Sequence, residues 1–292
     1  MTKKIRLIIL LVCGFLFLII TPSIVLYSLG YRIDFEKRRI VATGGIYLKI
    51  WPQPAEVFID SKLSGKTNIF FDYVFAQNLL PKQHSVLIKK EGYFSYQKTL
   101  NVKEKEVAKL EHILLFKKNM SFEFLKNSDN SPFKKQVSDS DIAQNIFLLE
   151  NNTLSIFDKK TNEFQVFYSP VKAFKVSPDG QKFLYCNDYE ILYSYLNSDN
   201  PEKLFINRFS EKINDCLWLN NDYIVFTING KIKISEIDNT NEVNTIEFPS
   251  IITLSDEKQI EIKNPEIFFN QSDKKLYILT NNNLLVSEKL TP

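Results

Sequence analysis

Histidine and cysteine, which supply most metal ligands and many acid–base or nucleophilic groups, are scarce in this sequence. It has two histidines, His84 and His112, and neither has a cysteine, a histidine or a carboxylate at metal-ligand spacing. No serine, histidine and aspartate pattern indicates a catalytic triad, although a triad is defined in space and the sequence leaves one open. We therefore predict no catalytic, cofactor-binding or metal-binding residues, and we expect the protein not to be an enzyme.

The positions of the two histidines give separate expectations. His84 follows the turn at Pro81, so we expect its side chain to be exposed. His112 falls on the same side of an alternating segment as Ala108 and Leu110, so we expect it in the core. Neither expectation gives a histidine a chemical role.

A strong net charge is also absent. The 37 basic and 34 acidic residues leave a formal charge of +3, which is too mild to indicate a nucleic-acid partner. The polar stretch 238–242 resembles a calcium loop, but it lacks the central glycine and a bidentate glutamate at the right distance. We predict a hairpin turn there and no metal.

Only three cysteines are present, and Cys13 lies in an apolar run. Cys186 and Cys216 both fall in segments that are typical of strands. They can pair only in an oxidising compartment, and nothing in the sequence brings their Cα atoms within bonding range. We expect free thiols, with a disulfide as the alternative.

One long apolar run, residues 7–29, contains no charged side chain and is long enough to cross a bilayer as a helix. This run is longer than the hydrophobic region of a secretory signal peptide. Ser28 and Gly30 form a poor cleavage site. These features favour an uncleaved signal-anchor over a cleaved signal peptide. We predict a cytoplasmic tail and transmembrane helix over residues 1–30, in a single-pass cell-membrane protein whose bulk is extracytoplasmic.

Apolar and polar residues then alternate with a period of two, as in Ile46, Leu48 and Ile50, which indicates a sheet with one buried face. We predict a juxtamembrane linker over residues 31–44 and a small β-sandwich over residues 45–116. The stretch 69–76 is unusually aromatic. We expect it to pack in the core, and the alternative is an exposed contact patch.

Four ordered motifs carry a family resemblance: Trp-Pro-Gln-Pro-Ala-Glu-Val-Phe-Ile-Asp at 51–60, Gly-Lys-Thr at 65–67, Leu-Leu-Pro at 79–81 and Glu-Gly-Tyr at 91–93. This segment resembles the PEGA domain, a small β-sandwich of bacterial and archaeal envelope proteins. It departs from the family pattern where Asn68 replaces the usual proline and where Lys82 and Gln83 replace the usual glycine. These departures concern the turns, so the implied sandwich stands.

Residues 117–141 are polar and irregular, and we predict a linker there. Residues 142–292 contain about four strand-rich units of roughly 45 residues each, which is the length of a propeller blade. Val-Ser-Pro-Asp-Gly-Gln-Lys-Phe-Leu-Tyr at 176–185 resembles the blade signature of TolB-type and WD40-like propellers. The resemblance implies β-propeller-like repeats.

Four units are few for a propeller, so we favour an incomplete array whose open sheet edges allow self-association. A closed ring is the alternative. It would require a strand from the N-terminal side, at 121–125 or 144–149, to complete the last unit.

The predicted fold class is therefore all-β after one N-terminal transmembrane helix. Together with the resemblance, it suggests a membrane-anchored cell-envelope protein that binds or scaffolds a protein or glycan without catalysis. The rival hypothesis is an extracytoplasmic glycan hydrolase or lyase with its site in the propeller funnel. Clustered carboxylates and aromatic residues in the funnel would favour the enzyme, and asparagine, serine and lysine would favour binding.

Overall fold

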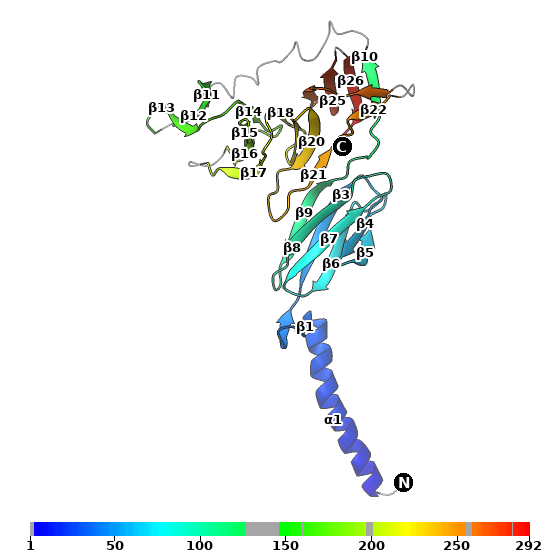
Figure 1. Cartoon of the computed structure of the whole chain (residues 1–292). Coiled ribbons are helices and arrows are strands. Elements are labelled where there is room, and N and C mark those ends of the chain that lie inside the picture. The colour runs from blue at the N-terminus through cyan, green and yellow to red at the C-terminus, as the bar shows by residue number, and fades with distance from the viewer. Residues whose placement is uncertain (1–2, 126–145, 159, 197–200, 255–258, 282) are drawn as a thin grey trace. The chain divides into compact units, whose positions relative to one another are not determined.

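The computed structural model describes residues 3–125, 146–158, 160–196, 201–254, 259–281 and 283–292 (Figure 1). One helix precedes a chain built otherwise of strands, which confirms the predicted fold class. The chain divides into two compact units. Unit 1 comprises Met1–Lys90 and Ser95–Leu115, and unit 2 comprises Glu91–Phe94 and Phe116–Pro292.

The helix α1 spans Lys3–Ser28 and includes Pro22. At 1.5 Å per residue its 26 residues extend about 39 Å, enough to cross a hydrocarbon layer of about 30 Å. Its apolar side chains are exposed. By length and composition α1 qualifies as a membrane span, and a signal sequence would meet the same criterion.

Unit 1 contains a hairpin and two sheets. The hairpin pairs β1 (Tyr31–Asp34) with β2 (Arg39–Ala42). One sheet has the order β6-β3-β9, from β3 (Gly44–Trp51), β6 (Tyr73–Leu79) and β9 (Val107–Leu114). The other has the order β5-β4-β7-β8, from β4 (Glu56–Ile59), β5 (Lys62–Lys66), β7 (Gln83–Lys89) and β8 (Tyr96–Asn101).

The core of unit 1 follows from the alternation seen in the sequence. Ile46, Leu48 and Ile50 are buried from one sheet, and Val57 and Ile59 are buried from the other. Both sheets thus bury one face, which is the packing expected of a β-sandwich.

Unit 2 is built from separate antiparallel sheets. The first contains β11 (Phe147–Glu150), β12 (Thr153–Asp158) and β13 (Glu163–Tyr168). The second contains β14 (Ala173–Val176), β15 (Lys182–Cys186), β16 (Glu190–Tyr195) and β17 (Leu204–Arg208). The third contains β18 (Ile213–Trp218), β19 (Tyr223–Ile228), β20 (Lys231–Glu236) and β21 (Thr245–Glu247).

The last sheet of unit 2 has the order β10-β26-β25-β24, from β10 (Phe122–Leu125), β24 (Glu266–Asn270), β25 (Lys275–Thr280) and β26 (Asn283–Lys289). A two-stranded hairpin of β22 (Ile251–Thr253) and β23 (Gln259–Glu261) precedes it in the chain. Successive sheets of three or four antiparallel strands are the arrangement of propeller-like repeats.

Strand β10 comes from the N-terminal side of unit 2 and pairs with the last strand, β26 (Figure 1). It lies in the segment predicted as a linker, whose residues 126–141 fall outside the described part of the chain. It falls within residues 121–125, one of the two alternative donors named for a closed ring. The other donor is the segment 144–149. Its residues 144 and 145 are not described, and residues 147–149 belong to β11, which pairs with β12. Closure of the ring and self-association stay predictions.

Cys186 and Cys216 form a disulfide, so the expectation of free thiols was wrong. Cys186 lies on β15 and Cys216 on β18, in consecutive sheets, with their Cα atoms 6.8 Å apart. Both belong to one apolar cluster that also includes Leu184 and Trp218. The pairing depends on sheet-to-sheet packing, which the separation of the two cysteines along the chain does not reveal.

Candidate binding surfaces

An aromatic surface lies on the outer face of the β6-β3-β9 sheet and on the loop before β6. We define it by six residues: Tyr47, Ile69, Phe70, Phe71, Tyr73 and Phe75. Ile69 is 91% exposed and Phe70 is 89% exposed. The expectation that residues 69–76 pack mainly in the core was wrong. Val74 and Ala76 are buried, but the aromatic members of the stretch face solvent.

The register between β3 and β6 explains the row of rings. Tyr47 is opposite Phe75, and residues two apart on a strand share one face. The ring of Tyr47 stacks on that of Tyr73 at 5.4 Å between centroids and lies 6.5 Å from that of Phe75. Gly45 leaves room for this row, because a Cβ there would lie 3.0 Å from the Phe75 ring.

Asn68 shapes the loop at the end of the row. Its side-chain Oδ1 accepts hydrogen bonds from the N–H groups of Phe70 at 2.9 Å and Phe71 at 3.0 Å. Its own N–H donates to the Phe71 carbonyl at 2.9 Å. The proline usual in the resemblance could form neither contact, because it lacks both the N–H and the amide oxygen. The departure at Asn68 therefore builds a turn that presents Ile69 and Phe70 to solvent.

Paired charges lie beside the aromatic surface. Lys49 forms an ion pair with Asp72 at 3.3 Å, and Lys109 with Glu111 at 3.9 Å. An apolar centre with a polar surround is the usual composition of a protein interface. Exposed apolar side chains that gather in this way mark interaction sites more often than chance exposure.

A cavity of about 410 Å³ lies in unit 2, between the first and second sheets. Seven of its lining residues are polar or aromatic groups that could contact a ligand: Asn152, Lys172, Asn187, Asp188, Tyr189, Glu190 and Arg208. Its size is within the usual range for small-molecule pockets.

Both carboxylates of this cavity are already paired. Asp188 lies 3.1 Å from Lys212 and 3.6 Å from Lys172, and the Lys212 hydrogen bond is the main cause that lowers the pKa of Asp188. Glu190 accepts from Asn187 and Tyr168, each at 3.0 Å, and the Asn187 bond is the main cause of its lowered pKa.

Glycoside hydrolysis needs one carboxylic acid with a raised pKa to protonate the leaving group. The pKa values of Asp188 and Glu190 are shifted in the opposite direction. The cavity mixes the carboxylates and tyrosine expected of the enzyme with the lysine and asparagines expected of a binding site. Neither of these two carboxylates has the raised pKa that a general acid requires.

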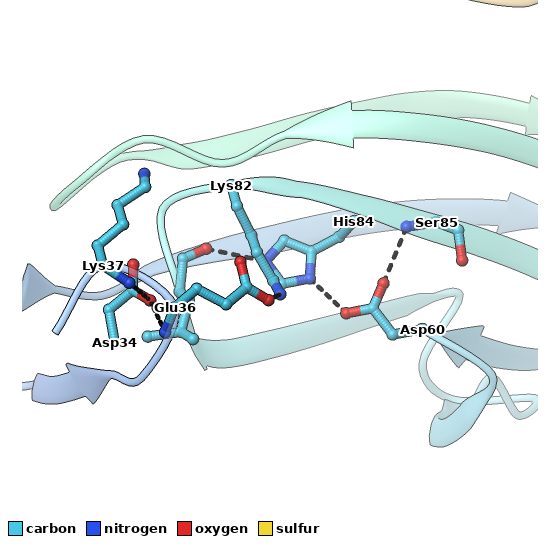
Figure 2. Close-up of polar contacts among 8 residues, drawn as sticks. Asp34, Glu36, Lys37, Asp60, Lys82, His84 and Ser85 are labelled. Atoms are coloured by element: carbon cyan, nitrogen blue, oxygen red, sulfur yellow. Dashed lines mark hydrogen bonds and ion pairs between the residues drawn. The ribbon is translucent and has the colours of Figure 1, made fainter.

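The close-up in Figure 2 shows His84, which is 3% exposed, so the expectation of an exposed residue was wrong. Its Nδ1 lies 2.6 Å from Asp60 Oδ2, and its Nε2 lies 2.8 Å from the Leu80 carbonyl. Both partners are acceptors, so an imidazolium can donate to both. His84 lies on the same side of β7 as Val86 and Ile88, and this is the buried side. The sequence already shows this alternation, which predicts a buried His84 and is a better guide here than the nearby turn at Pro81.

Asp60 connects the β4–β5 turn to β7, and the Ser85 N–H donates to its Oδ1 at 3.0 Å. Burial raises the pKa of Asp60, but hydrogen bonds from His84 and Ser85 and the charges of His84 and Lys82 outweigh burial and lower it. The geometry joins two strands of one sheet. The histidine of the pair is enclosed, and the aspartate is partly exposed.

His112 is exposed, so its predicted place in the core was wrong. The pairing between β3 and β9 shifts by one residue: Leu48 is opposite Leu110, whereas Ile50 is opposite Ile113. The extra residue on β9 is a bulge that reverses the alternation. Ile113 is buried as a result, and His112 points to solvent.

No group of three histidine, cysteine, aspartate or glutamate residues suited to a metal occurs within the described residues. The stretch 238–242 connects antiparallel strands β20 and β21, which agrees with the predicted turn. The Thr240 N–H donates to the Asp238 carboxylate at 2.9 Å. This is a turn-type contact within the connection.

The sheets of unit 1 and the comparison with known families agree on the class of its main domain. Residues 43–115 match the PEGA domain, so this part of the chain is a PEGA domain that follows an apolar helix and precedes propeller-like repeats. No curated protein matches the sequence.

Two solved structures are similar to longer parts of the chain. YCF48 bound to a D1 peptide is 14% identical, with 70% of this chain and 60% of that one covered and a TM-score of 0.32. An extracellular domain described as that of one-component system BT4673 from B. thetaiotaomicron is 8% identical. In that case 90% of this chain and 32% of the other are covered, with a TM-score of 0.35. Both TM-scores are too low to carry an inference about this chain.

Proposed function

We propose that this protein is anchored in the cell membrane by α1 and uses its β domains outside the cytoplasm to hold a protein partner without catalysis. The aromatic surface of unit 1 is the observation that carries the proposal. Six large side chains are displayed on a rigid sheet and a hydrogen-bonded loop. Scaffolded loops of this kind commonly carry recognition.

The location is supported by two independent features. α1 has the length and composition of a membrane span, and the disulfide between Cys186 and Cys216 is of a kind that persists in oxidising compartments. Large domains translocate largely regardless of their charge, so the basic residues after α1 do not oppose an extracytoplasmic unit 1.

The chemistry of the aromatic surface favours a protein over a glycan. Sugar rings stack on aromatic faces, and the row of Tyr47, Tyr73 and Phe75 could serve either partner. The most exposed member, however, is Ile69, an aliphatic side chain that suits an apolar pocket on a protein.

Photocrosslinking in the native envelope tests the proposal. A photoreactive phenylalanine analogue replaces Phe70 in the full chain, and a matched probe replaces Phe164, which is 40% exposed in unit 2. We expect a discrete protein adduct from position 70 and none from position 164. Glycan adducts at position 70 would instead support a glycan partner, and equal labelling at both positions would contradict the proposal.

A further inference from the structure

The β1–β2 hairpin has two unlike faces. On one face of the hairpin, Asp34 and Val41 are buried. Ile33 and Ile40 are directly opposite each other across the strands and are both exposed, and Phe35 at the tip is 83% exposed. The hairpin therefore presents a small apolar face that nothing in the described part of unit 1 covers.

The hairpin begins at the end of α1, and local contacts fix it there. The Arg32 guanidinium donates to the Tyr27 carbonyl at 2.8 Å and lies 3.6 Å above the Tyr27 ring. The Gly30 carbonyl accepts from the Thr43 N–H at 2.9 Å, where the chain leaves the hairpin. Figure 1 shows β1 beside the C-terminal end of α1. If α1 spans a bilayer, the hairpin lies at the level of the lipid headgroups.

Basic side chains accompany the apolar face. Lys37 and Arg38 in the turn are exposed, and no carboxylate of the described residues lies within 4.0 Å of either. Arg39 is 3.8 Å from Glu104. Apolar side chains combined with unpaired cations are the features by which segments bind the surface of anionic membranes.

Hydrogen bonds and an ion pair also hold the turn of the hairpin. The Asp34 carboxylate accepts from the N–H groups of Glu36 at 3.0 Å and Lys37 at 3.1 Å, which fixes the turn. Glu36 in turn pairs with Lys82 at 3.1 Å, and Figure 2 shows both contacts. The turn therefore has a set position on the end of the sandwich that carries Lys82.

From these features we infer that the β1–β2 hairpin is a membrane-surface contact. Ile33, Phe35 and Ile40 enter the headgroup region, while Lys37 and Arg38 bind the phosphates of anionic lipids. The contact sets how unit 1 stands on the bilayer. This inference rests on the proposed membrane span of α1.

The test uses the full chain with Cys13→Ser, reconstituted in vesicles with or without the anionic lipid phosphatidylglycerol. An environment-sensitive fluorophore is attached at Phe35→Cys, with Phe70→Cys as the matched control on an equally exposed residue. We expect spin-labelled lipids to quench the label at position 35 at least several-fold more than the label at position 70, and most strongly with anionic lipid.

Charge reversal separates the electrostatic part of the membrane contact from its apolar part. The double change Lys37→Glu with Arg38→Glu should reduce quenching at position 35 in anionic vesicles to the level seen in neutral ones. Lys62→Glu, an exposed cation on β5, serves as the charge control and should change nothing.

Two failures are distinguishable. If an alkaline wash strips the chain from the vesicles, α1 does not span, and the proposed function fails together with this inference. If the chain stays in the vesicles but the label at position 35 is no more quenched than the label at position 70 in both lipid mixtures, this inference alone is overturned.

Discussion

Each unit has one group of contacting aromatic rings, and the two groups lie on opposite kinds of surface. In unit 2 the group around Phe183 is inside: the Phe183 centroid lies 4.8 Å from that of Phe147 and 5.4 Å from that of Phe167. In unit 1 the rings of Tyr47, Tyr73 and Phe75 contact one another on the solvent side of β3 and β6.

The number of covered faces explains the difference. All five residues of β15 and all six of β19 are buried, because neighbouring sheets cover both faces of these strands. β6 alternates between exposed and buried residues, because only its inner face meets another sheet. The number of covered sheet faces thus places Phe183 in the core of unit 2 and leaves Tyr73 and Phe75 at the surface of unit 1.

The largest expected effect is at Phe183, which has no exposed surface. Phe183→Ala should reduce the stability of unit 2 by about 3–5 kcal/mol, because it removes buried area and leaves a cavity among the rings. Urea unfolding of the detergent-solubilised chain measures this change. A loss below about 1 kcal/mol would contradict the placement of the rings inside unit 2.

Removal of the disulfide should have the next largest effect. Cys186 and Cys216 are 30 residues apart, and Cys186→Ala with Cys216→Ala should reduce stability by about 2–4 kcal/mol. The loss should be confined to unit 2, since unit 1 has no part in the bond. Cys13→Ser is the control and should leave the urea midpoint unchanged. Equal midpoints with and without reductant would argue against the bond.

Particular residues show what could be predicted from the sequence. The sequence predicts strand-rich repeats over residues 142–292, and strands such as β12, β13, β24 and β25 occur there, because alternation and turns are local properties. The number of strands in each sheet is harder to predict. Strand β21, for example, has three residues, which are too few to show a periodic pattern.

The candidate sites were less predictable, because they depend on contacts between distant segments. The exposure of Phe70 depends on the Asn68 turn, and the burial of His84 depends on Asp60, 24 residues earlier. The position of His112 depends on a bulge that the residue types do not specify. The inward direction of His84 is itself predictable, because His84 and Val86 are two residues apart on one strand.

A smaller loss of stability is expected from a change at Asp60, and this change tests unit 1 in the comparison of the two units. Asp60→Asn removes the charged acceptor of a buried histidine and should reduce the stability of unit 1 by about 1–3 kcal/mol at neutral pH. Glu104→Gln, in an exposed ion pair with Arg39, is the control and should cost less than about 1 kcal/mol.

The same contact predicts the sign of a pH dependence. Because the folded pKa of Asp60 lies below its ordinary value of 3.8, the stability it contributes is present above that pH and is lost as pH falls through the lowered value. Urea midpoints between pH 6 and pH 2 should therefore fall less steeply in Asp60→Asn than in the original chain. Parallel curves would contradict the assignment.

The smallest effect on stability should come from Phe70, the counterpart of Phe183 on the opposite kind of surface. Phe70→Ala removes the same side chain, yet at 89% exposure it removes almost no buried area and leaves the Asn68 contacts intact, since these use backbone groups. We expect a change within about 0.5 kcal/mol in the same urea experiment. A loss that approaches that of Phe183→Ala would show that Phe70 is packed in the folded protein. The aromatic surface would then be part of a core, and the contrast between the units would disappear.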